Sequence, residues 1–336
     1  MKLSICIPTY NFGQFIGETL ESIVTQLEPE VEIVILDGGS TDDTEEVVKG
    51  FVTRHPAIKY VRQQFRGGID RDMARVVDLA RGDYCWLFSS DDIMRPGAMR
   101  RVLVEIASGM DIYLGGMTLC DRGMATIEEH PVLGSPWGSV FNLADTEERQ
   151  RYFECAQTTV ALFSFMGVIV IKRDRWQAHK LDEAYVGSCW AHVVRILGMM
   201  PDGLSVKYLG ESLLRKRSDN DSFMDRGIVH RYAIAINGYN RIAGDIFGED
   251  SLEARHIRRI LADEFPPKFF LSAKLDCIRS GRLLDIKALN RLVQTTYRDR
   301  SLRNCLYLVT YRLLPARLYQ LAKVVYKSMR LVLRRA

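Results

Sequence analysis

Short apolar runs alternate with amphipathic segments over the first part of the chain. The apolar runs carry no regular polar alternation, which predicts strands buried on both faces. Between them, apolar residues recur at helical spacing, as at Ile16, Leu20 and Ile23. This alternation predicts an α/β fold with a mostly parallel sheet and helices on both faces. The predicted strands are 3–10, 31–37, 58–63 and 84–90, and the predicted helices are 15–27, 41–55 and 72–81.

The pattern is less regular after residue 110. A stretch rich in Gly, Pro and polar residues, 122–150, predicts a mobile loop between two further strands. No strand pattern follows the last extended segment, so the C-terminal part is expected to be helical. The elements predicted here are strands at 111–121 and 164–173, a helix at 189–200, an extended segment at 204–217 and helices from about residue 225 onward.

Composition narrows the protein class. The 336 residues are 47% apolar, enough for a substantial core. The seven cysteines show no CxxC spacing, which argues against a zinc site or a disulfide framework and favours the reducing cytoplasm. No apolar stretch is long enough to span a bilayer, and the chain opens directly on a strand, so we expect neither a membrane span nor a signal peptide.

The net charge of +4 conceals an asymmetry. Residues 287–336 contain twelve Lys and Arg and one acid, so this part carries +11 and the rest of the chain −7. A segment both basic and apolar suits an anionic membrane surface better than nucleic acid, which we do not expect as a partner. The alternative is an amphipathic helix docked on the core. On a helix, one side of the tail would carry Lys323, Lys327, Arg330 and Arg334, and the other Leu318, Leu321, Val325, Met329 and Val332.

Acidic and polar residues follow three of the predicted strands. Asp37 ends the second strand, the pair Asp91–Asp92 follows the fourth, and Thr9 to Asn11 end the first. The carboxyl ends of parallel strands share one edge of a sheet, where ligands of such folds bind. Adjacent carboxylates repel each other, so the pair contributes little to folding by itself. The simpler alternative is that Ser90 or Asp91 caps a helix that starts near Pro96.

The chain lacks the usual glycine-rich phosphate-binding loops. No G-x-G-x-x-G follows the first strand, and no P-loop is present. Acids at a ligand-binding edge without a phosphate cradle suggest that Mg²⁺ or Mn²⁺ joins the carboxylates to a diphosphate.

Four motifs together resemble the family-2 glycosyltransferases, which have the GT-A fold. They are "IPTYN" (7–11), "VILDGGSTDDT" (34–44), "ARGDYCWLFSSDD" (80–92) and "LDEAYVG" (181–187), and they keep the family's order over roughly residues 1–200. Within the family, "GGIDRDMARVV" and "RSDNDSF" (217–223) are similar to the abequosyltransferase-like subgroup of bacterial surface-polysaccharide assembly.

The resemblance implies roles for individual residues. It implies a nucleotide pocket lined by Thr9, Tyr10 and Asn11. It also implies that Asp37, with Ser40 in the same turn, accepts a hydrogen bond from the base. Residues matching positions that contact sugar or phosphate are Asp70, Asp72 and Arg75, for which a salt-bridged helix start is the alternative. Those matching the metal–diphosphate motif are Asp91 and Asp92.

The chain departs from the family pattern at two places. Ser89 replaces the first acid of the metal motif, and Ser188–Cys189 replaces the Glu–Asp pair whose aspartate is the usual general base. An inverting transfer still needs a group that accepts the acceptor's proton. The candidates are His192, Glu183 and Asp182, of which His192 titrates nearest neutrality.

These observations predict a metal-dependent, inverting glycosyltransferase. The expected donor is a nucleoside-diphosphate sugar, and the expected acceptor is a lipid-linked O-antigen or capsule precursor at the inner face of the cell membrane. The alternatives are a catalytically silent nucleotide-sugar-binding protein and a sugar-phosphate nucleotidylyltransferase, although the latter needs a basic glycine-rich loop. The expected parts are a GT-A domain at 1–205, a helical region at 206–286 and basic amphipathic helices at 287–336.

Overall fold

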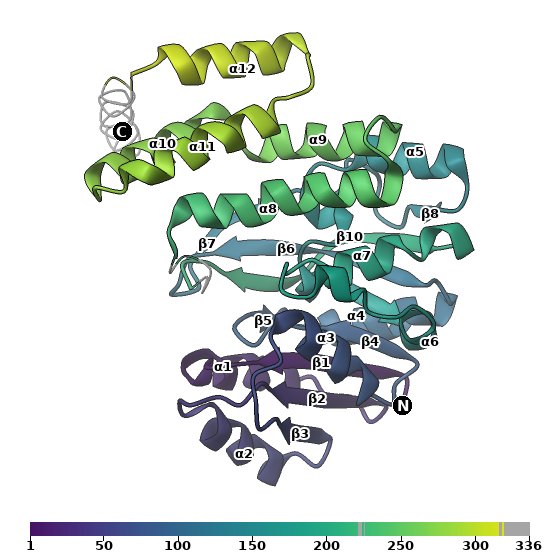
Figure 1. Cartoon of the computed structure of the whole chain (residues 1–336). Helices are drawn as coiled ribbons and strands as arrows, with labels where there is room; N and C mark the ends of the chain where they lie inside the picture. The colour runs from purple at the N-terminus through teal and green to yellow at the C-terminus, as the bar shows by residue number, and fades with distance from the viewer. Residues whose placement is uncertain (221–223, 225, 316–317, 319–336) are drawn as a thin grey trace, which may run out of the picture. The chain divides into compact units, whose positions relative to one another are not determined.

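The chain folds into two compact units, Met1–Asp221 and Ser222–Ala336, which are described separately. Figure 1 shows them coloured along the chain. The computed structural model describes residues 1–220, 224, 226–315 and 318.

Strands β1 to β4 and helices α1 to α3 alternate as predicted. The four strands are mutually parallel in the order β3-β2-β1-β4. Every residue of β1, β2 and β4 is buried, which explains their continuous apolar pattern. The observed bounds are β1 (Leu3–Thr9), α1 (Gly13–Val24), β2 (Val31–Asp37), α2 (Thr44–Arg54), β3 (Ile58–Arg62), α3 (Ile69–Asp78) and β4 (Tyr84–Leu87).

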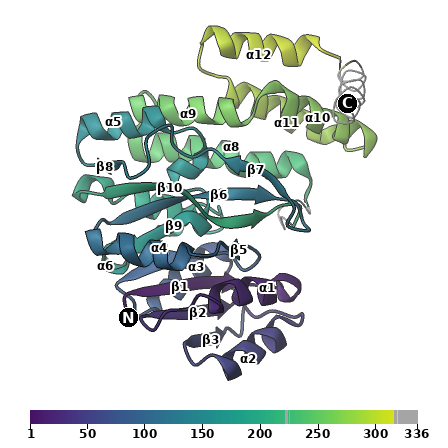
Figure 2. The same ribbon diagram turned by 180° about the vertical axis from the view of Figure 1, so that it is seen from behind.

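The order of these strands reverses once. The chain steps from β1 to β3 in one direction and then returns to place β4 on the other side of β1. Right-handed crossovers put α1 and α2 on one face and α3 on the other. Accordingly, α3 lies in front of the sheet in Figure 1 and behind it in Figure 2. Ligands bind at such a reversal, here the carboxyl ends of β1 and β4.

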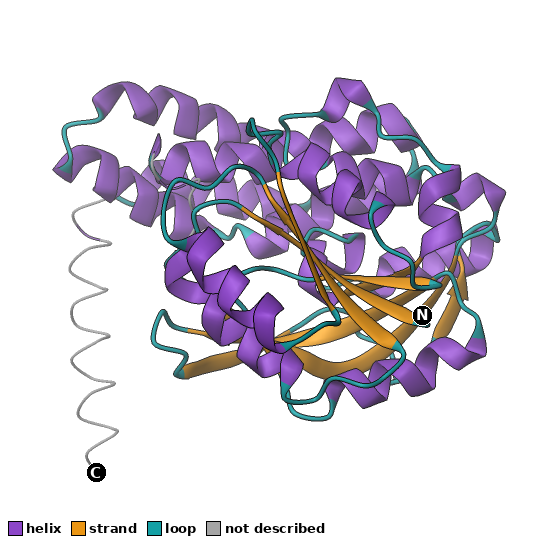
Figure 3. Cartoon of the chain, turned by 90° about the horizontal axis from the view of Figure 1, so that it is seen from below, coloured by secondary structure: helices purple, strands orange, loops and turns teal. Residues whose placement is uncertain are grey.

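The other half of the sheet is mixed. Strand β9 (Ile169–Lys172) runs antiparallel to both β4 and β6 (Ile112–Cys120). Strand β10 (Ser205–Arg217) lies parallel to β6, and β5 (Ile93–Met94) runs antiparallel to β10. The first unit therefore extends beyond the predicted boundary at 205, because β10 belongs to its sheet. Figure 3 shows the strands of the sheet fanned by its twist.

The stretch 122–150, expected to be a mobile loop, contains regular structure. Strand β7 (Thr126–His130) pairs with β6, and β8 (Val140–Asn142) pairs with β10. The prediction was wrong because β7 is an edge strand whose residues are mostly exposed and polar, so no apolar run marks it. The remaining helices of this unit are α4 (Ala98–Glu105), α5 (Thr146–Cys155), α6 (Arg173–Ala178) and α7 (Ala191–Leu197), with 3₁₀ turns at Ile106–Ser108, Thr159–Leu162, Met166–Val168, Glu183–Tyr185 (η4) and Met200–Asp202.

The described part of the second unit is helical, as predicted. Its core is aromatic: Phe270 packs edge-on against Tyr297 and Tyr311, with ring centroids 5.8 and 6.3 Å away. The predicted boundary at 286 falls within α11. The elements are α8 (Ile228–Ile242), a π-helical turn (Ala243–Phe247), α9 (Leu252–Glu264), α10 (Pro267–Arg279), α11 (Leu283–Thr296) and α12 (Leu302–Leu313).

No helix within the described ranges has the length and apolar character needed to cross a bilayer. The predicted basic face of the tail, from Lys323 to Arg334, lies outside the described residues.

Candidate active site

The turns that follow β1 and β2 are tied together at the sheet edge. The backbone N–H of Asn11 donates to Ser40 Oγ at 2.9 Å, and Asn11 Oδ1 accepts from the N–H of Thr41 at 2.8 Å. Asn11 has φ of 57°, a left-handed conformation that asparagine tolerates better than most residues. The N–H of Gly38 donates to the carbonyl of Thr9 at 2.9 Å. The structure thus brings the predicted nucleotide-binding residues of both strand ends into one cradle.

Asp37 lies beneath this cradle. Its side chain is fully buried, and its Oδ1 accepts from both the N–H and the Oγ of Ser40 at 2.7 Å. The hydroxyl of Tyr60 donates to Asp37 Oδ2 at 2.6 Å, and burial together with this carboxylate raises the pKa of Tyr60. Asp37 therefore organises the turn. A direct bond to a base, which we predicted, would require this buried carboxylate to become accessible.

A second carboxylate, Asp72, occupies the space beside Gly38. A Cβ atom on Gly38 would lie 2.9 Å from Asp72 Oδ2, and one on Gly67 would lie 2.4 Å from Asp72 Oδ1. The side-chain amide of Gln63 donates to the same Oδ1 at 2.6 Å. Burial raises the pKa of Asp72. Two glycines thus make room for an acid from α3 at the end of β2, next to Tyr10.

Asp70 holds backbone. Its Oδ2 accepts from the N–H groups of Gly187 and Cys189 at 2.8 and 3.1 Å, and its Oδ1 accepts from Ala191 at 3.2 Å. Cys189 has φ of 73°, so these bonds stabilise a conformation that non-glycine residues rarely adopt. This buried carboxylate fixes the 187–191 segment, and its predicted contact with sugar or phosphate stays a prediction. The salt-bridged alternative does not hold for Asp70, because its partners are peptide groups.

The pair Asp91–Asp92 follows β4 at the strand reversal. Asp91 is partly exposed, and its carboxylate accepts from Ser89 Oγ and from the amide of Asn220. Asp92 is buried; its Oδ1 accepts from the N–H of Arg217 at 2.9 Å, while its Oδ2 has no hydrogen-bond partner in the described structure. Burial, and then the neighbouring carboxylate of Asp91, raise the pKa of Asp92 well above its usual range.

Two residues of this site escaped the sequence reasoning. Arg217 is buried at the end of β10, where its Nε donates to the carbonyl of Asp91 at 3.0 Å and its guanidinium pairs with Glu18. Asn220 lies three residues after Arg217, and its side-chain amide donates to Asp91 Oδ2. Both belong to "RSDNDSF", which carried the resemblance but no assigned role. The sequence signal that could have identified Arg217 is its place as the last residue of a long extended segment, 204–217.

The pair fits a divalent cation. Two hard carboxylates lie side by side, and one buried oxygen, Asp92 Oδ2, lacks a partner that a cation would supply. No group of three or more His, Cys, Asp or Glu with metal-binding geometry occurs among the described residues. Among the described acidic, His and Cys side chains, the protein would therefore offer Asp91 and Asp92, and the diphosphate and water would complete the coordination.

The three candidate bases differ sharply in accessibility. His192 is buried, and its Nε2 lies 3.0 Å from the carbonyl of Phe163, so this nitrogen carries the proton. Burial lowers its pKa to about 4, which makes it a poor proton acceptor at neutral pH. These observations argue against the catalytic role we favoured from the sequence.

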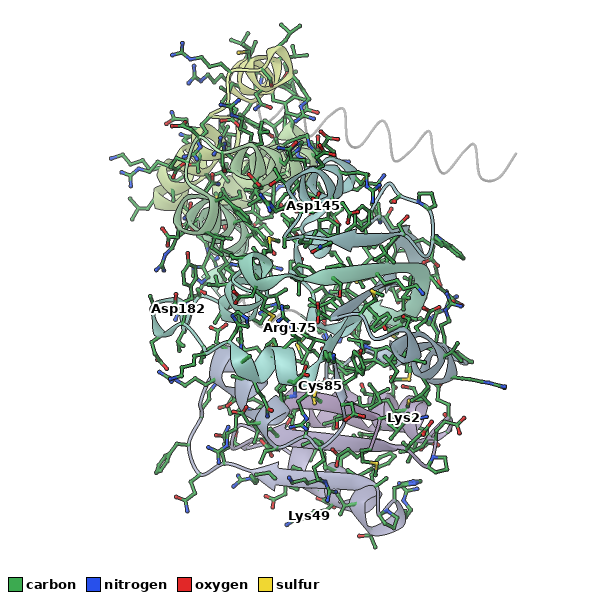
Figure 4. The ribbon with its side chains drawn as sticks, turned by 90° about the vertical axis from the view of Figure 1, so that its right-hand side faces the viewer. Lys2, Lys49, Cys85, Asp145, Arg175 and Asp182 are labelled. Atoms are coloured by element: carbon green, nitrogen blue, oxygen red, sulfur yellow. The ribbon has the colours of Figure 1, made fainter. Side chains whose placement is uncertain are left out.

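The other two candidates are exposed. Glu183 pairs with Arg71 through both carboxylate oxygens, at 3.0 and 2.6 Å. Asp182 accepts from the N–H of Ala184 at 2.9 Å and caps η4; Figure 4 shows it at the edge of the ribbon, well apart from Cys85 in β4. Arg75, predicted to contact sugar or phosphate, is exposed on α3. The structure thus brings the predicted nucleotide-binding residues of β1 and β2 together at one edge of the sheet, while His192 is buried and Glu183 and Asp182 are exposed.

Comparison with known proteins shows which family this chain resembles. Residues 4–169 match the family described as glycosyl transferase family 2. The abequosyltransferase RfbV of Salmonella typhimurium is 31% identical, over 79% of this chain and 81% of its own length. A Campylobacter jejuni relative, "GalNAc(5)-diNAcBac-PP-undecaprenol beta-1,3-glucosyltransferase", is 24% identical over 56% of this chain and 57% of its own length.

Solved structures share the fold at lower identity. S. aureus TarS 1–349 in complex with UDP-GlcNAc is 17% identical, with a TM-score of 0.58 over 89% of this chain and 82% of that one. The mannosyltransferase PcManGT from Pyrobaculum calidifontis, in complex with GDP-Man and Mn²⁺, is 15% identical, with a TM-score of 0.52 over 92% of this chain and 79% of that one.

Proposed function

The chain belongs to the family-2 glycosyltransferases, and from this premise we propose that it transfers a sugar from a nucleoside-diphosphate donor to a hydroxyl of a lipid-linked polysaccharide precursor, with inversion. The family match replaces the nucleotidylyltransferase alternative. The abequosyltransferase relative supports a role in surface-polysaccharide assembly, and the Campylobacter relative, whose name includes an undecaprenol-linked glycan, supports the lipid-linked acceptor.

One observation carries the proposed chemistry. The Asp91–Asp92 pair lies at the strand reversal, with a buried carboxylate oxygen that has no partner in the described structure. A bound Mg²⁺ or Mn²⁺ would neutralise the negative charge that develops on the departing nucleoside diphosphate. The cradle of Thr9, Tyr10 and Asn11 would hold the nucleotide. The carboxylate of Asp72 lies at the same edge of the sheet, beside Gly38.

The proposed reaction is a displacement at the anomeric carbon. The acceptor oxygen forms the new bond while the bond to the diphosphate breaks, and the diphosphate leaves with the electron pair. The acceptor's proton passes to a base, for which we propose the exposed candidates Glu183 and Asp182 rather than His192. In the base's absence the transfer should slow by about 10²–10⁴-fold.

A panel of nucleotide sugars tests the proposal. Purified protein is screened for thermal stabilisation by each donor with and without Mn²⁺, followed by assays of donor hydrolysis and transfer. Asp91→Asn should lose metal-dependent stabilisation, and Asp83→Asn, an exposed acid just before β4, serves as the matched control. Stabilisation by no donor, or turnover undiminished in excess chelator, would contradict the proposal.

Glu183→Gln, Asp182→Asn and His192→Gln then locate the base. A slowed chemical step with unchanged donor binding identifies it. If only His192→Gln slows the transfer, the assignment from burial is wrong.

The membrane location is also part of the proposal. The charge of +11 on residues 287–336 supports binding to an anionic inner leaflet, where a lipid-linked acceptor would be found.

A further inference from the structure

A cationic pocket lies along α3. Its volume is about 460 Å³, and neither Asp91 nor Asp92 lines it. The lining comes from α3 and the segment before it, from the end of α6 and the segment after it, and from α7. The lining residues are Gln63, Gly67, Arg71, Ala74, Arg75, Asp78, Gln177, Lys180, Leu181 and Arg195.

The charges around this pocket are unbalanced. Its lining carries four cations and one acid, Asp78. Glu183 neutralises Arg71 through a bidentate pair. Arg75, Lys180 and Arg195 form no ion pair with any described carboxylate within 4.0 Å, so after subtracting Asp78 the lining keeps an excess of two positive charges.

Arg195 is the buried member of this set. Only 8% of the residue is exposed, and burial lowers its pKa to about 10, so it remains charged at neutral pH. Its Nε and Nη2 both donate to the carbonyl of Trp176, at 3.0 and 2.7 Å, and its guanidinium carbon lies 4.3 Å from the ring centroid of Trp176. The carboxylate of Asp78 partly offsets the effect of burial on the pKa of Arg195, which leaves the exposed Arg75 and Lys180 as the source of the excess positive charge.

We propose that this pocket binds a phosphoryl anion of the diphosphate class, at a site that adjoins the donor cradle through the bond between Gln63 and Asp72 but does not include the Asp91–Asp92 pair. A diphosphate ester carries about two negative charges and matches the excess, and arginine's planar set of N–H donors suits phosphate oxygens. The anion could be free diphosphate or the diphosphate of a lipid-linked acceptor; the acceptor source rests on the proposed function, whereas anion binding does not.

Calorimetry on the full-length protein tests this site. The protein is titrated with inorganic diphosphate in EDTA, which suppresses metal-dependent binding at the donor site, and then with a short-chain prenyl diphosphate. Arg75→Gln and Lys180→Gln should each weaken binding about ten- to a hundredfold, the loss expected for one charge-assisted bond. Both side chains are exposed, so these variants should fold. Lys49→Gln, an exposed lysine on α2, is the matched control, and Asp91→Asn should bind normally.

The outcomes distinguish free diphosphate from the diphosphate of a lipid-linked acceptor. Equal binding of both ligands, lost in the two pocket variants, identifies a general diphosphate site; binding of the prenyl diphosphate alone, with the same loss, identifies the acceptor. Binding of neither ligand, or binding lost in Asp91→Asn but kept in Arg75→Gln and Lys180→Gln, overturns the inference. Donor turnover is measured on the same samples, so the pocket can fail while the proposed function stands.

Discussion

The backbone N–H of Arg217 donates to Asp92 Oδ1 at 2.9 Å, across a separation of 125 residues. The side chain of Arg217 continues the connection, because its Nε bonds the carbonyl of Asp91 at 3.0 Å and its guanidinium lies 4.8 Å from the ring centroid of Phe15. The carboxylate pair is therefore positioned from β10 and α1 as well as from its own strand.

Arg217→Lys tests this positioning. Lysine keeps the charge and the backbone bond but loses the Nε contact to Asp91, so we expect metal-dependent transfer to fall about tenfold or more, with the protein still folded. Kinetics at several Mn²⁺ concentrations measure the effect. Arg54→Lys, an exposed arginine at the end of α2, should leave the rate unchanged; an equally unaffected Arg217→Lys would contradict a positioning role.

Asp92→Asn separates stability from function. The amide keeps the shape of the side chain and removes a buried charge beside Asp91, so thermal stability should be unchanged or higher. Stabilisation of the protein by Mn²⁺ with a donor, and transfer itself, should both be lost. Thermal melts with and without Mn²⁺ provide the measurement. Retained stabilisation by Mn²⁺ would exclude Asp92 as a ligand.

Asp70→Ala should destabilise the 187–191 segment. The change leaves three backbone N–H groups without their acceptor, at a cost of about 1–3 kcal/mol for a buried group left unpaired. Urea unfolding measures the loss, and hydrogen exchange at Gly187, Cys189 and Ala191 should accelerate. Exchange unchanged at these three positions would show that Asp70 does not hold them.

His192 should make stability sensitive to acid. Its folded-state pKa of about 4 lies below the ordinary 6.5, so the unfolded chain takes up a proton first and stability falls as the pH drops from about 6.5 toward 4. At pH 5 the loss is about 2 kcal/mol relative to neutral pH. In His192→Gln, the difference in unfolding free energy between pH 7 and pH 5 should shrink by about that amount. An unchanged difference would show that His192 titrates normally.

Removal of residues 316–336 tests the membrane proposal. This cut keeps α12, whose Tyr311 packs in the core of the second unit, whereas a cut near residue 300 would remove that contact. We expect donor-induced stabilisation to persist and binding to anionic vesicles at low salt to weaken strongly, at roughly 1 kcal/mol for each lost basic residue near the surface. If the full-length protein does not bind such vesicles, or if the truncated protein unfolds, the tail has a structural role instead.

The first half of the fold could be predicted because burial on both faces leaves continuous apolar runs. Strand β9 was also found, but its antiparallel direction was not, because direction is set by the connection rather than by residue type. Edge strand β7 left no apolar signal. Helix α3 begins at Ile69, three residues before the predicted start, after Gly68 with φ of 82°.

Candidate site residues could be predicted where they stand at the end of their own strand. Asp91 and Asp92 were proposed as metal ligands because adjacent acids after a buried strand repel each other, and that role stays a prediction. Asp70 looked the same in the sequence, but its partners are backbone groups more than a hundred residues away. His192 was favoured for its ordinary pKa, which burial then changed.

The contact between Gly38 and Asp72 has an evolutionary consequence. Because a side chain at 38 would occupy the space of the Asp72 carboxylate, the two positions cannot both carry large residues without a shift of the turn or of α3. An acid at position 38 would therefore require a small residue at position 72, just as Asp72 now requires Gly38. Among relatives, positions 38 and 72 should therefore covary, because large residues at both positions would require this edge of the sheet to change.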